Sequence, residues 1–418
     1  MNDPLPRLRR LLAEVLRSNP FYGPRLRAAG VRSPGDLSSM DDYRRLPFTT
    51  KEELSLDQAR HPPYGTNLTW PRERYVRLHQ TSGTTGQRLR WLDTQADWDW
   101  FTGCWMEVYR GAGVRASDRL FFAFSFAPFI GFWSAFDAAA RMGAMAIPGG
   151  GMSSAQRLEA LGANEATVLV CTPTYALHLA GVARGQGLDP AATAVRTTIH
   201  AGEPGASLPA TRARIEQAWG ARCFDHAGAT EVGAWGFECG EQDGLHLNED
   251  EFLCEILEPG TDRPADEGEL VITNLGRIGS PVIRYRTGDR VRWHESATCP
   301  CGRSWRRLAG GVIGRLDDAL LVRGVNLYPG AIENVVRRFP EVEEFAVHVR
   351  RPGDLDELEI EVEVNAGGRG AAEVTEGLTA AAHQELAVRP RVRAAAPGSL
   401  PRFELKARRV TDHREPAS

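Results

Sequence analysis

A continuous apolar segment in the middle of the chain sets the strongest constraint on the fold. The run "ATVLVCTPT", residues 166–174, lacks the polar and apolar alternation of a half-exposed strand. Such a run is typical of a strand buried on both faces of a parallel sheet. Helical periodicity is present on both sides of it, at residues 155–161 and 211–219. Strands that alternate with helices predict an α/β domain.

The pattern changes after Gly314. It predicts an extended "ALLVRG" segment, a helix that opens at Pro329, the strands "EEFAVHV" and "LEIEVEV", and a final helix near residues 371–386. That order fits a small α+β domain of roughly a hundred residues. We therefore expect a large multi-layer N-terminal α/β domain over residues 1–316 and a small α+β domain over residues 317–418.

Charge and the N-terminal segment exclude several classes of protein. The 50 basic and 54 acidic residues give a net charge of −4, which offers no broad surface for nucleic acid or anionic lipid. The first twenty residues predict an amphipathic helix over Leu8–Leu16, but they contain no uninterrupted apolar core. Neither a signal peptide nor a membrane span is indicated, so we expect a cytoplasmic protein without a membrane partner.

A loop rich in Ser, Thr and Gly, "HQTSGTTGQRLRW", lies between two short alternating segments that predict strands. It is not a Walker A loop, because Gln87 stands where the lysine would be and a strand follows. Its glycines let the main chain approach closely, so its N–H groups and hydroxyls can surround phosphate oxygens. A plain hairpin turn explains the same residues equally well.

Further motifs carry a resemblance to a known family. The segments "TSGTTG" (81–86), "GATE" (228–231), "YRTGD" (285–289) and "GRLDD" (314–318) resemble, in order and approximate spacing, those of the adenylate-forming superfamily. Within it, "LPFTTKEEL" (46–54), "CPCGR" (299–303), "GVNLYPGAIE" (324–333) and "PRFELKARRV" (401–410) look like the phenylacetate-CoA ligase branch. The resemblance covers nearly the whole chain.

The resemblance implies a two-step chemistry. ATP and a carboxylic acid would give an acyl adenylate and pyrophosphate, and coenzyme A would then displace AMP to give an acyl-CoA thioester. Glu231 would hold Mg²⁺ next to Thr230. Lys406 would stabilise the charge that develops between carboxylate and α-phosphate. The small domain would rotate about a hinge near Asp317 between the two steps.

The same resemblance implies the nucleotide-binding residues, with Asp289 and Arg315 at the ribose. The remaining candidates are Thr81, Ser82, Gly83, Thr84, Thr85, Gly86, Gly202, Glu203, His226, Ala227 and Gly228. Each main assignment has a structural alternative: Glu231 could be a helix N-terminal charge, Asp289 a turn residue, and Lys406 part of a solvated basic face.

Some positions depart from the family pattern. Ala227 stands where relatives often have an aromatic residue against adenine, and His226 or another residue would have to cover the base. Arg88 follows one place after the position of the usual loop lysine, and Leu405 replaces the glycine that often precedes the catalytic lysine.

Cysteine spacing predicts a metal site. Seven cysteines, an odd number, argue against a disulfide framework. Cys239 and His246 together with Cys299 and Cys301 offer three thiols and one imidazole, which matches a closed tetrahedral structural zinc site. It also resembles a site found in parts of the phenylacetate-CoA ligase branch. The alternative is a tight turn with free thiols.

Substrate, acceptor and assembly remain open at the level of sequence. The aromatic run at 121–133, the glycines at 149–151 and "TPTYA" at 172–176 are candidates for the acyl pocket, although core packing explains them too. The family suggests an aryl or arylacetic acid. The acceptor could instead be an amine or a carrier-protein thiol, and a nucleotide-binding homologue without catalysis is a third alternative. A homodimer is plausible from the family alone.

Overall fold

The largest sheet in the computed structural model has eight strands in the order β13-β9-β8-β7-β6-β5-β3-β4. The structure describes residues 3–81, 88–126, 128, 130–353, 355–365, 367–403 and 407–414. From β7 to β4 the neighbouring strands are parallel, and from β7 to β13 they are antiparallel. The strands are β3 (Arg119–Phe122), β4 (Met145–Pro148), β5 (Val168–Cys171), β6 (Thr197–His200), β7 (Arg222–Ala229), β8 (Gly233–Phe237), β9 (Leu245–Leu247) and β13 (Arg307–Leu308).

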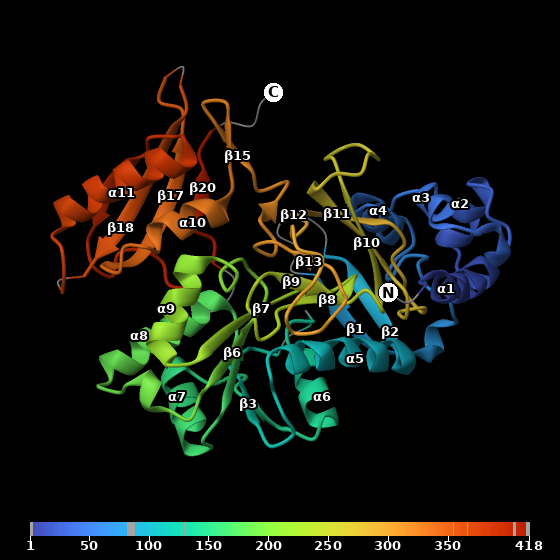
Figure 1. The fold of residues 1–418 in the computed structure, drawn as a ribbon, viewed down its shortest axis with the longest axis horizontal. Coiled ribbons are helices and arrows are strands. Elements are labelled where there is room, and N and C mark those ends of the chain that lie inside the picture. The colour runs from blue at the N-terminus through green and yellow to red at the C-terminus, as the bar shows by residue number, and fades with distance from the viewer. Residues whose placement is uncertain are drawn as a thin grey trace.

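Helices cover both faces of the parallel part of this sheet (Figure 1). One face packs on α7, α8 and α9, and the other packs on α5 and α6. Every residue of β5 is buried, which explains why its sequence is apolar throughout. The helices are α5 (Gln95–Gly111), α6 (Trp133–Arg141), α7 (Ser154–Ala163), α8 (Pro173–Gly185) and α9 (Pro209–Trp219).

A second sheet joins the N-terminal helices to the rest of the molecule. Its order is β10-β11-β12-β14, and the apolar stripe of α1 packs against side chains of this region such as Leu253 and Ile283. The strands are β10 (Phe252–Leu257), β11 (Glu267–Asn274), β12 (Tyr285–Arg292) and β14 (Gly314–Arg315). The helices are α1 (Leu5–Ser18), α2 (Tyr22–Ala28), α3 (Met40–Arg44) and α4 (Lys51–Arg60).

A separate hairpin, β1 (Tyr75–Gln80) with β2 (Arg90–Thr94), frames the Ser/Thr/Gly loop. The two strands are antiparallel, and residues 82–87 between them lie outside the described residues. The predicted strand pair is thus confirmed.

The C-terminal region, by which we mean residues 320–414, has its own hydrophobic core, whose buried members lie between Leu320 and Val388 and against which Val392 and Val410 pack. Helices α10 and α11 pack on a sheet of order β19-β18-β17-β20, and a small hairpin, β15 with β16, precedes them. The elements are β15 (Leu320–Val322), β16 (Val325–Leu327), α10 (Pro329–Val336), β17 (Val342–Arg350), β18 (Glu357–Val364), α11 (Ala371–Leu386), β19 (Arg391–Ala395) and β20 (Val410–Asp412).

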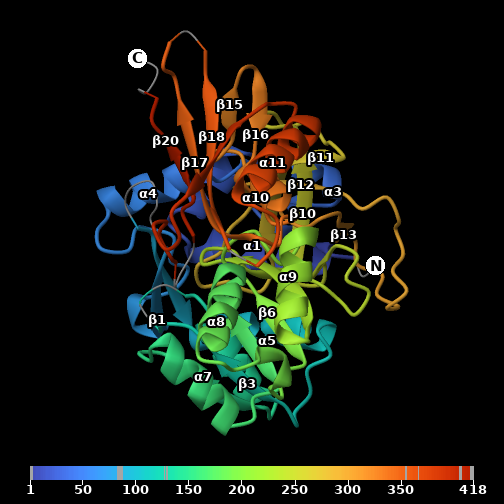
Figure 2. The same cartoon turned by 90° about the vertical axis from the view of Figure 1, so that its left-hand side faces the viewer.

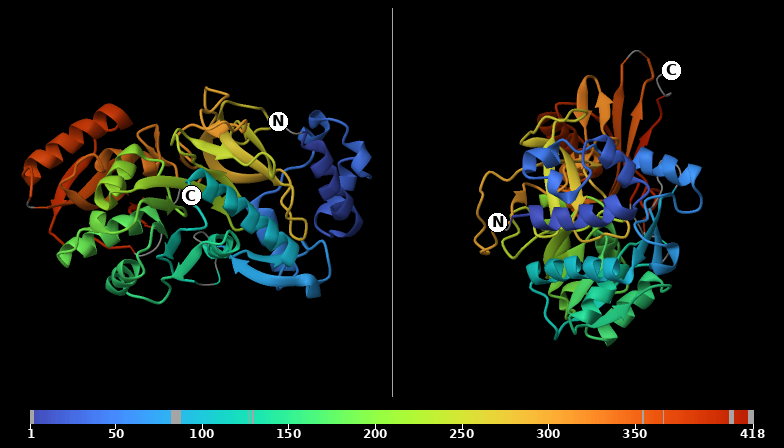
Figure 3. Two further views of the ribbon diagram at one scale, coloured as in Figure 1. Left: turned by 60° about the horizontal axis from the view of Figure 1, so that its bottom comes forward. Right: turned by 90° about the vertical axis from the view of Figure 1, so that its right-hand side faces the viewer.

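The C-terminal region sits over α8 and α9, with α10 above α9 (Figure 2). The N-terminal helices lie at the opposite end of the molecule (Figure 3). The mixed α/β fold is as the sequence predicted. Strands β19 and β20, which pair in parallel with β18 and β17 respectively, were not predicted. The boundary between residues 316 and 317 stays a prediction. Among the described residues, no helix is both long and apolar enough to cross a membrane.

Candidate active site

The carboxyl ends of the parallel strands bring three separate segments to one edge of the main sheet. Cys171 at the end of β5 is paired with His200 at the end of β6, and His200 is paired with Asp225 in β7. Ligands of open α/β sheets bind outside the carboxyl ends of such strands. The predicted residues Gly202 and Glu203 follow β6 directly, and His226 to Gly228 lie in β7. The fold therefore places these candidates on neighbouring strand ends.

The β7–β8 connection needs glycine for close packing. A Cβ on Gly228 would lie 2.9 Å from the carbonyl oxygen of Gly233. Ala227 is half-buried, whereas the neighbouring His226 ring is buried against Trp105 with the ring centroids 4.2 Å apart. The ring of His226 also bonds the Gly236 carbonyl through Nδ1 at 2.7 Å. Burial lowers the pKa of His226 to about 4, so the ring is neutral. It packs inward, and a role above adenine does not follow from this geometry.

Glu231 lies in the turn after β7 and is held by a buried phenol. The Tyr285 hydroxyl donates to Glu231 Oε1 at 2.8 Å, and only 8% of the Glu231 surface is exposed. Burial, followed by the charge of Glu231, raises the pKa of Tyr285 well above its usual value. The phenol thus stays a donor. Two motifs far apart in sequence, "GATE" and "YRTGD", meet through this bond.

A fully buried ion pair ties the hairpin to the same turn. Arg277 donates to both oxygens of Asp93, at 2.6 and 2.8 Å, and donates to the Thr230 carbonyl at 2.5 Å. Asp93 lies in β2, and neither charged side chain is exposed to solvent. Burial alone would raise the pKa of Asp93, but the charge of Arg277 and its bonds to the carboxylate hold that pKa below its usual value. Sequence analysis missed both residues. A lone arginine in an apolar stretch signals a buried partner, but does not identify it.

The base of the Ser/Thr/Gly loop is closed by one residue pair. The Thr81 N–H donates to the Leu89 carbonyl at 2.9 Å, and the Leu89 N–H donates to Thr81 Oγ1 at 3.1 Å. Thr81 is therefore a structural anchor of the loop. The other predicted loop residues, Ser82, Gly83, Thr84, Thr85 and Gly86, lie outside the described residues.

The predicted ribose residues meet across two paired strands. Asp289 in β12 is in register with Arg315 in β14, and Arg315 Nη1 lies 3.1 Å from Asp289 Oδ1. The same guanidinium donates to the Thr287 carbonyl at 2.6 Å and to Asp317 Oδ1 at 3.0 Å. Gly288 has a φ of +73°, so the chain turns sharply between these contacts. The predicted hinge residue thus sits next to the ribose pair.

Glu203 makes a contact that the sequence did not predict. Its carboxylate accepts the Thr174 N–H at the start of α8, at 2.9 Å, and the Ala407 N–H of the C-terminal region, at 2.8 Å. Lys406, the residue before Ala407, lies outside the described residues. The predicted nucleotide residue therefore joins the large N-terminal part to the C-terminal region in this arrangement.

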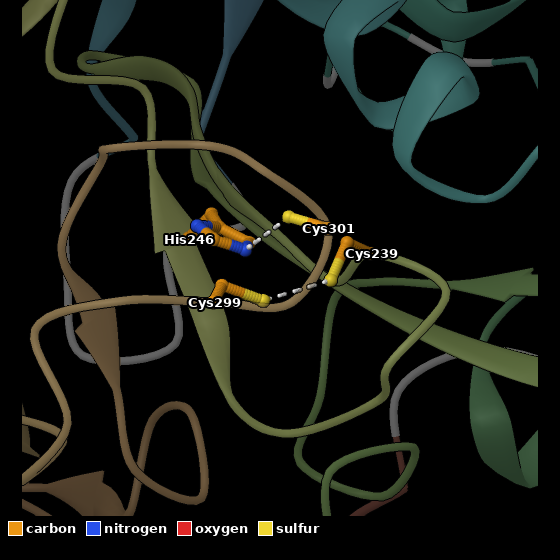
Figure 4. A group of neighbouring side chains, drawn as sticks. All are labelled: Cys239, His246, Cys299 and Cys301. Carbon is orange, nitrogen blue, oxygen red and sulfur yellow. Dashed lines mark hydrogen bonds between the residues drawn. The ribbon is translucent and has the colours of Figure 1, made fainter.

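The four predicted metal ligands converge (Figure 4). One ligand atom from each of Cys239, His246, Cys299 and Cys301 lies within 4.8 Å of the others. The Cys239 and Cys299 sulfurs are 3.7 Å apart, and Cys301 Sγ is 3.4 Å from His246 Nε2. A tetrahedral zinc with Zn–S bonds of about 2.3 Å and a Zn–N bond of about 2.0 Å spaces its ligands by about 3.8 and 3.5 Å. The donor set fits zinc.

A backbone acceptor orients the imidazole of this group. His246 Nδ1 lies 3.2 Å from the Trp305 carbonyl oxygen, which leaves Nε2 facing the three sulfurs. Metal-binding histidines commonly use such a bond to fix their tautomer and orientation. The cluster joins β9 to the loop before β13, at the edge of the large sheet.

Comparison with known proteins places this geometry in a family. Residues 324–414 match the AMP-binding enzyme C-terminal domain family. A phenylacetate-coenzyme A ligase of Thermus thermophilus is 34% identical over 86% of this chain and 80% of its own. A phenylacetate-coenzyme A ligase of Escherichia coli is 32% identical over 98% of this chain and 93% of its own. The chain belongs to the adenylate-forming superfamily, in its phenylacetate-CoA ligase-like branch. It is an ATP-dependent CoA ligase that activates a carboxylic acid as an acyl adenylate and then forms the CoA thioester.

Solved structures of a 2-hydroxyisobutyryl-CoA ligase in two catalytic states allow the domain arrangement of this chain to be compared with each state. In its postadenylation state with an acyl-AMP, that enzyme matches at a TM-score of 0.91, with 31% identity over 98% of this chain and 89% of its own. In its thioesterification state with CoA, the same enzyme matches at a TM-score of only 0.72, with 32% identity over the same fractions of the two chains. Because the protein and the coverage are the same, the drop reflects a different arrangement of one fold. The domain arrangement of the CoA ligase described here is closer to that of the relative's postadenylation state than to that of its thioesterification state.

Proposed function

We propose that this CoA ligase activates an aryl or arylacetic acid. The phenylacetate-coenzyme A ligases of Thermus thermophilus and Pseudomonas putida, 34% and 33% identical to this chain, carry this proposal. Aromatic side chains gather just after β3, where Phe124 lies edge-on to Phe132 and Phe126 lies edge-on to Trp133, with centroids 5.1 and 4.5 Å apart. Aromatic rings favour such edge-on partners, so this cluster suits an aromatic acyl group.

A short aliphatic hydroxy acid is the second candidate. The 2-hydroxyisobutyryl-CoA ligase, a structural match at a TM-score of 0.91, supports it. Transfer to an amine or to a carrier protein gains no support from these relatives.

The roles of individual residues complete the proposal. Tyr285 occupies one oxygen of Glu231, and we assign the other oxygen to Mg²⁺, which prefers oxygen ligands and neutralises phosphate charge. Asp289, oriented by Arg315, would accept the ribose hydroxyls. The hydroxyl-rich loop from Thr81 to Gly86 would bind phosphate oxygens, and Gly202 and Ala227 would border the nucleotide. Lys406 would act on the carboxylate and α-phosphate during adenylation.

The C-terminal region would belong to a mobile lid that begins at residue 317. Its separate core and the bonds of Arg315 to both Asp289 and Asp317 support this division. Rotation at Asp317 would then change the position of the lid without disturbing either core. We also propose a cytoplasmic enzyme, because ATP and coenzyme A are available there, and a homodimer as its assembly.

A substrate panel tests the acid and the acceptor together. ATP–pyrophosphate exchange with Mg²⁺ would be measured for phenylacetate, benzoate and 2-hydroxyisobutyrate, followed by mass spectrometry of the products formed with CoA. We expect exchange and a CoA thioester with an aromatic acid. Exchange with only the hydroxy acid would favour the second candidate, and tight ATP binding without exchange for any acid would contradict a catalytic role.

Zinc would have a structural role at the Cys₃His cluster. With four protein ligands no position remains for water, so the ion would fasten the loop before β13 to β9. We expect one zinc per chain by elemental analysis of the purified protein and a lower unfolding temperature for Cys299→Ser. Cys104→Ser is the matched control, because Cys104 is buried outside the cluster. Equal losses of stability and full zinc content in both variants would contradict this role.

A further inference from the structure

Glu203 occupies a junction between parts of the chain that are distant in sequence. It is half-buried, and each of its two carboxylate oxygens accepts one backbone N–H. Thr174 supplies one N–H from the first turn of α8, and Ala407 supplies the other from the C-terminal region. The peptide N–H of Ala407 belongs to the bond that joins it to Lys406. Glu203 therefore holds the residue that directly follows Lys406 in the sequence.

The chemistry of this junction requires an ionised carboxylate. A carboxylate accepts at both oxygens, and its charge strengthens both bonds. The N-terminal end of α8 adds a favourable dipole. Burial, and to a smaller extent Glu333, raise the pKa of Glu203, while the two N–H donors oppose the rise. A glutamine would present an amide NH₂ to one of the two N–H groups, so one bond would be replaced by a clash of donors.

A second contact repeats the link two residues further along. Arg409 is anchored within the C-terminal region by Glu344, with Nε 2.7 Å from Oε1. Its Nη1 reaches across to Thr174 Oγ1 at 3.3 Å. The N–H and the hydroxyl of Thr174 thus both take part in the junction, and α8 serves as the fixed side. In this arrangement of the two parts, Ala407 and Arg409 are both held against the first turn of α8.

We propose that Glu203 is a positioning residue for the adenylating half-reaction, because it fixes the backbone that follows Lys406 against α8. This inference rests on the role proposed for Lys406. Since the relative that matches at 0.91 is in its postadenylation state and the same enzyme matches at 0.72 in its thioesterification state, the junction belongs to the first arrangement. Glu203 has no part in the second half-reaction.

The test separates the two half-reactions. Adenylation is measured by ATP–pyrophosphate exchange with the best acid of the panel, and thioester formation by mixing the enzyme with the synthetic acyl adenylate and CoA. For Glu203→Gln we expect kcat for exchange to fall at least about tenfold, as the loss of a charge-assisted bond implies. The KM for ATP and the rate of thioester formation should each change less than about twofold. Glu203→Asp, which keeps the charge but is shorter, should fall between wild type and Glu203→Gln.

A double-variant cycle decides whether Glu203 acts through Lys406. If it does, Glu203→Gln combined with Lys406→Ala is no slower in exchange than Lys406→Ala alone. Losses that multiply would overturn the proposal, as would an equal loss in both half-reactions, an unchanged exchange rate, or a raised KM for ATP with unchanged kcat. If Lys406→Ala itself leaves exchange intact, the role of Lys406 fails, whatever Glu203→Gln does.

Asp97→Asn provides a matched control. Asp97, a buried carboxylate, also accepts two backbone N–H groups, those of Thr94 and Gly279, each at 3.0 Å. Both partners lie in the large N-terminal part. This variant should lose stability without separating the two half-reactions. A separation as large as that in Glu203→Gln would overturn the assignment of Glu203 to the junction.

Discussion

The two polar links around the candidate active site differ in how they are built. The link between the hairpin and the Glu231 turn is the pair of Arg277 and Asp93, in which neither side chain is exposed. The link between the N-terminal part and the C-terminal region includes hydrogen bonds to backbone groups, made by Glu203 and Arg214, and the neutral hydroxyl of Thr174 as a partner of Arg409. A buried charge pair cannot separate without large cost, whereas a bond to a peptide group is readily exchanged for water. The first link suits a fixed nucleotide site and the second a lid that moves.

Replacing Arg277 tests the fixed link and should have the largest effect. Arg277→Met leaves Asp93 buried without its partner, which typically costs about 3–5 kcal/mol. Urea unfolding measures the loss. Arg141→Met is the control, because Arg141 and Asp99 form an exposed pair at 2.7 Å, for which we expect at most about 1 kcal/mol. Similar losses in the two variants would contradict the special status of the buried pair.

Replacing Lys406 tests the mobile side. Lys406→Ala should slow ATP–pyrophosphate exchange by about 10²–10³-fold, because a donor that stabilises transition-state charge is lost. Thioester formation from a supplied acyl adenylate should be unaffected. Arg60→Ala, an exposed arginine in the last turn of α4, serves as the control. If both half-reactions of Lys406→Ala fall equally, the division of labour between the two arrangements is wrong.

The pH dependence of stability tests the burial of His200, which lies at the carboxyl end of β6 in the large N-terminal part. Burial lowers the pKa of His200 from 6.5 to about 4, so between these values the unfolded chain binds a proton that the folded protein excludes. Stability therefore falls as pH decreases through this window, by at most about 1.4 kcal/mol per pH unit for one group. In His200→Asn, the part of this stability loss that comes from protonation of His200 should be absent.

The substitution is conservative because His200 uses only Nδ1, at 3.1 Å from the Cys171 carbonyl, and an Asn amide can take that place. Unfolding in urea at pH 7, 6 and 5 gives the slope. His226 and His246, whose pKa values are also about 4, and Asp225, whose pKa burial raises to about 8, remain in both proteins and contribute to the residual slope. If the free energy of unfolding falls with pH by the same amount in wild type and variant, His200 does not titrate as described.

Replacing Arg214 tests the mobile link with the smallest expected effect. Arg214 Nη2 lies 3.1, 3.0 and 2.8 Å from the carbonyl oxygens of Phe339, Pro340 and Val342. Burial and then repulsion by Arg337 lower its pKa to about 10, so it is still charged at neutral pH. Arg214→Met should reduce adenylation several-fold, about 1 kcal/mol, with little change in thioester formation. Arg17→Met, on the exposed face of α1, is the control, and equal rates for the two variants would remove Arg214 from the link.

The sequence alone determined the local elements and the chemical groups. The apolar run that became β5, the strands around the hydroxyl-rich loop and the helix from Pro329 follow from periodicity and turn residues, which act over short distances. Cys299 and Cys301 were recognisable because a ligand spacing is a local property.

Only the tertiary structure decided which groups meet. Asp93 and Arg277 are 184 positions apart, and Glu203 and Ala407 are 204 apart. Neither separation leaves a periodic signal, because such contacts depend on how sheets and helices pack rather than on neighbouring residues. For the same reason the inward orientation of His226 and the second anchor of Glu203 could not be read from their motifs.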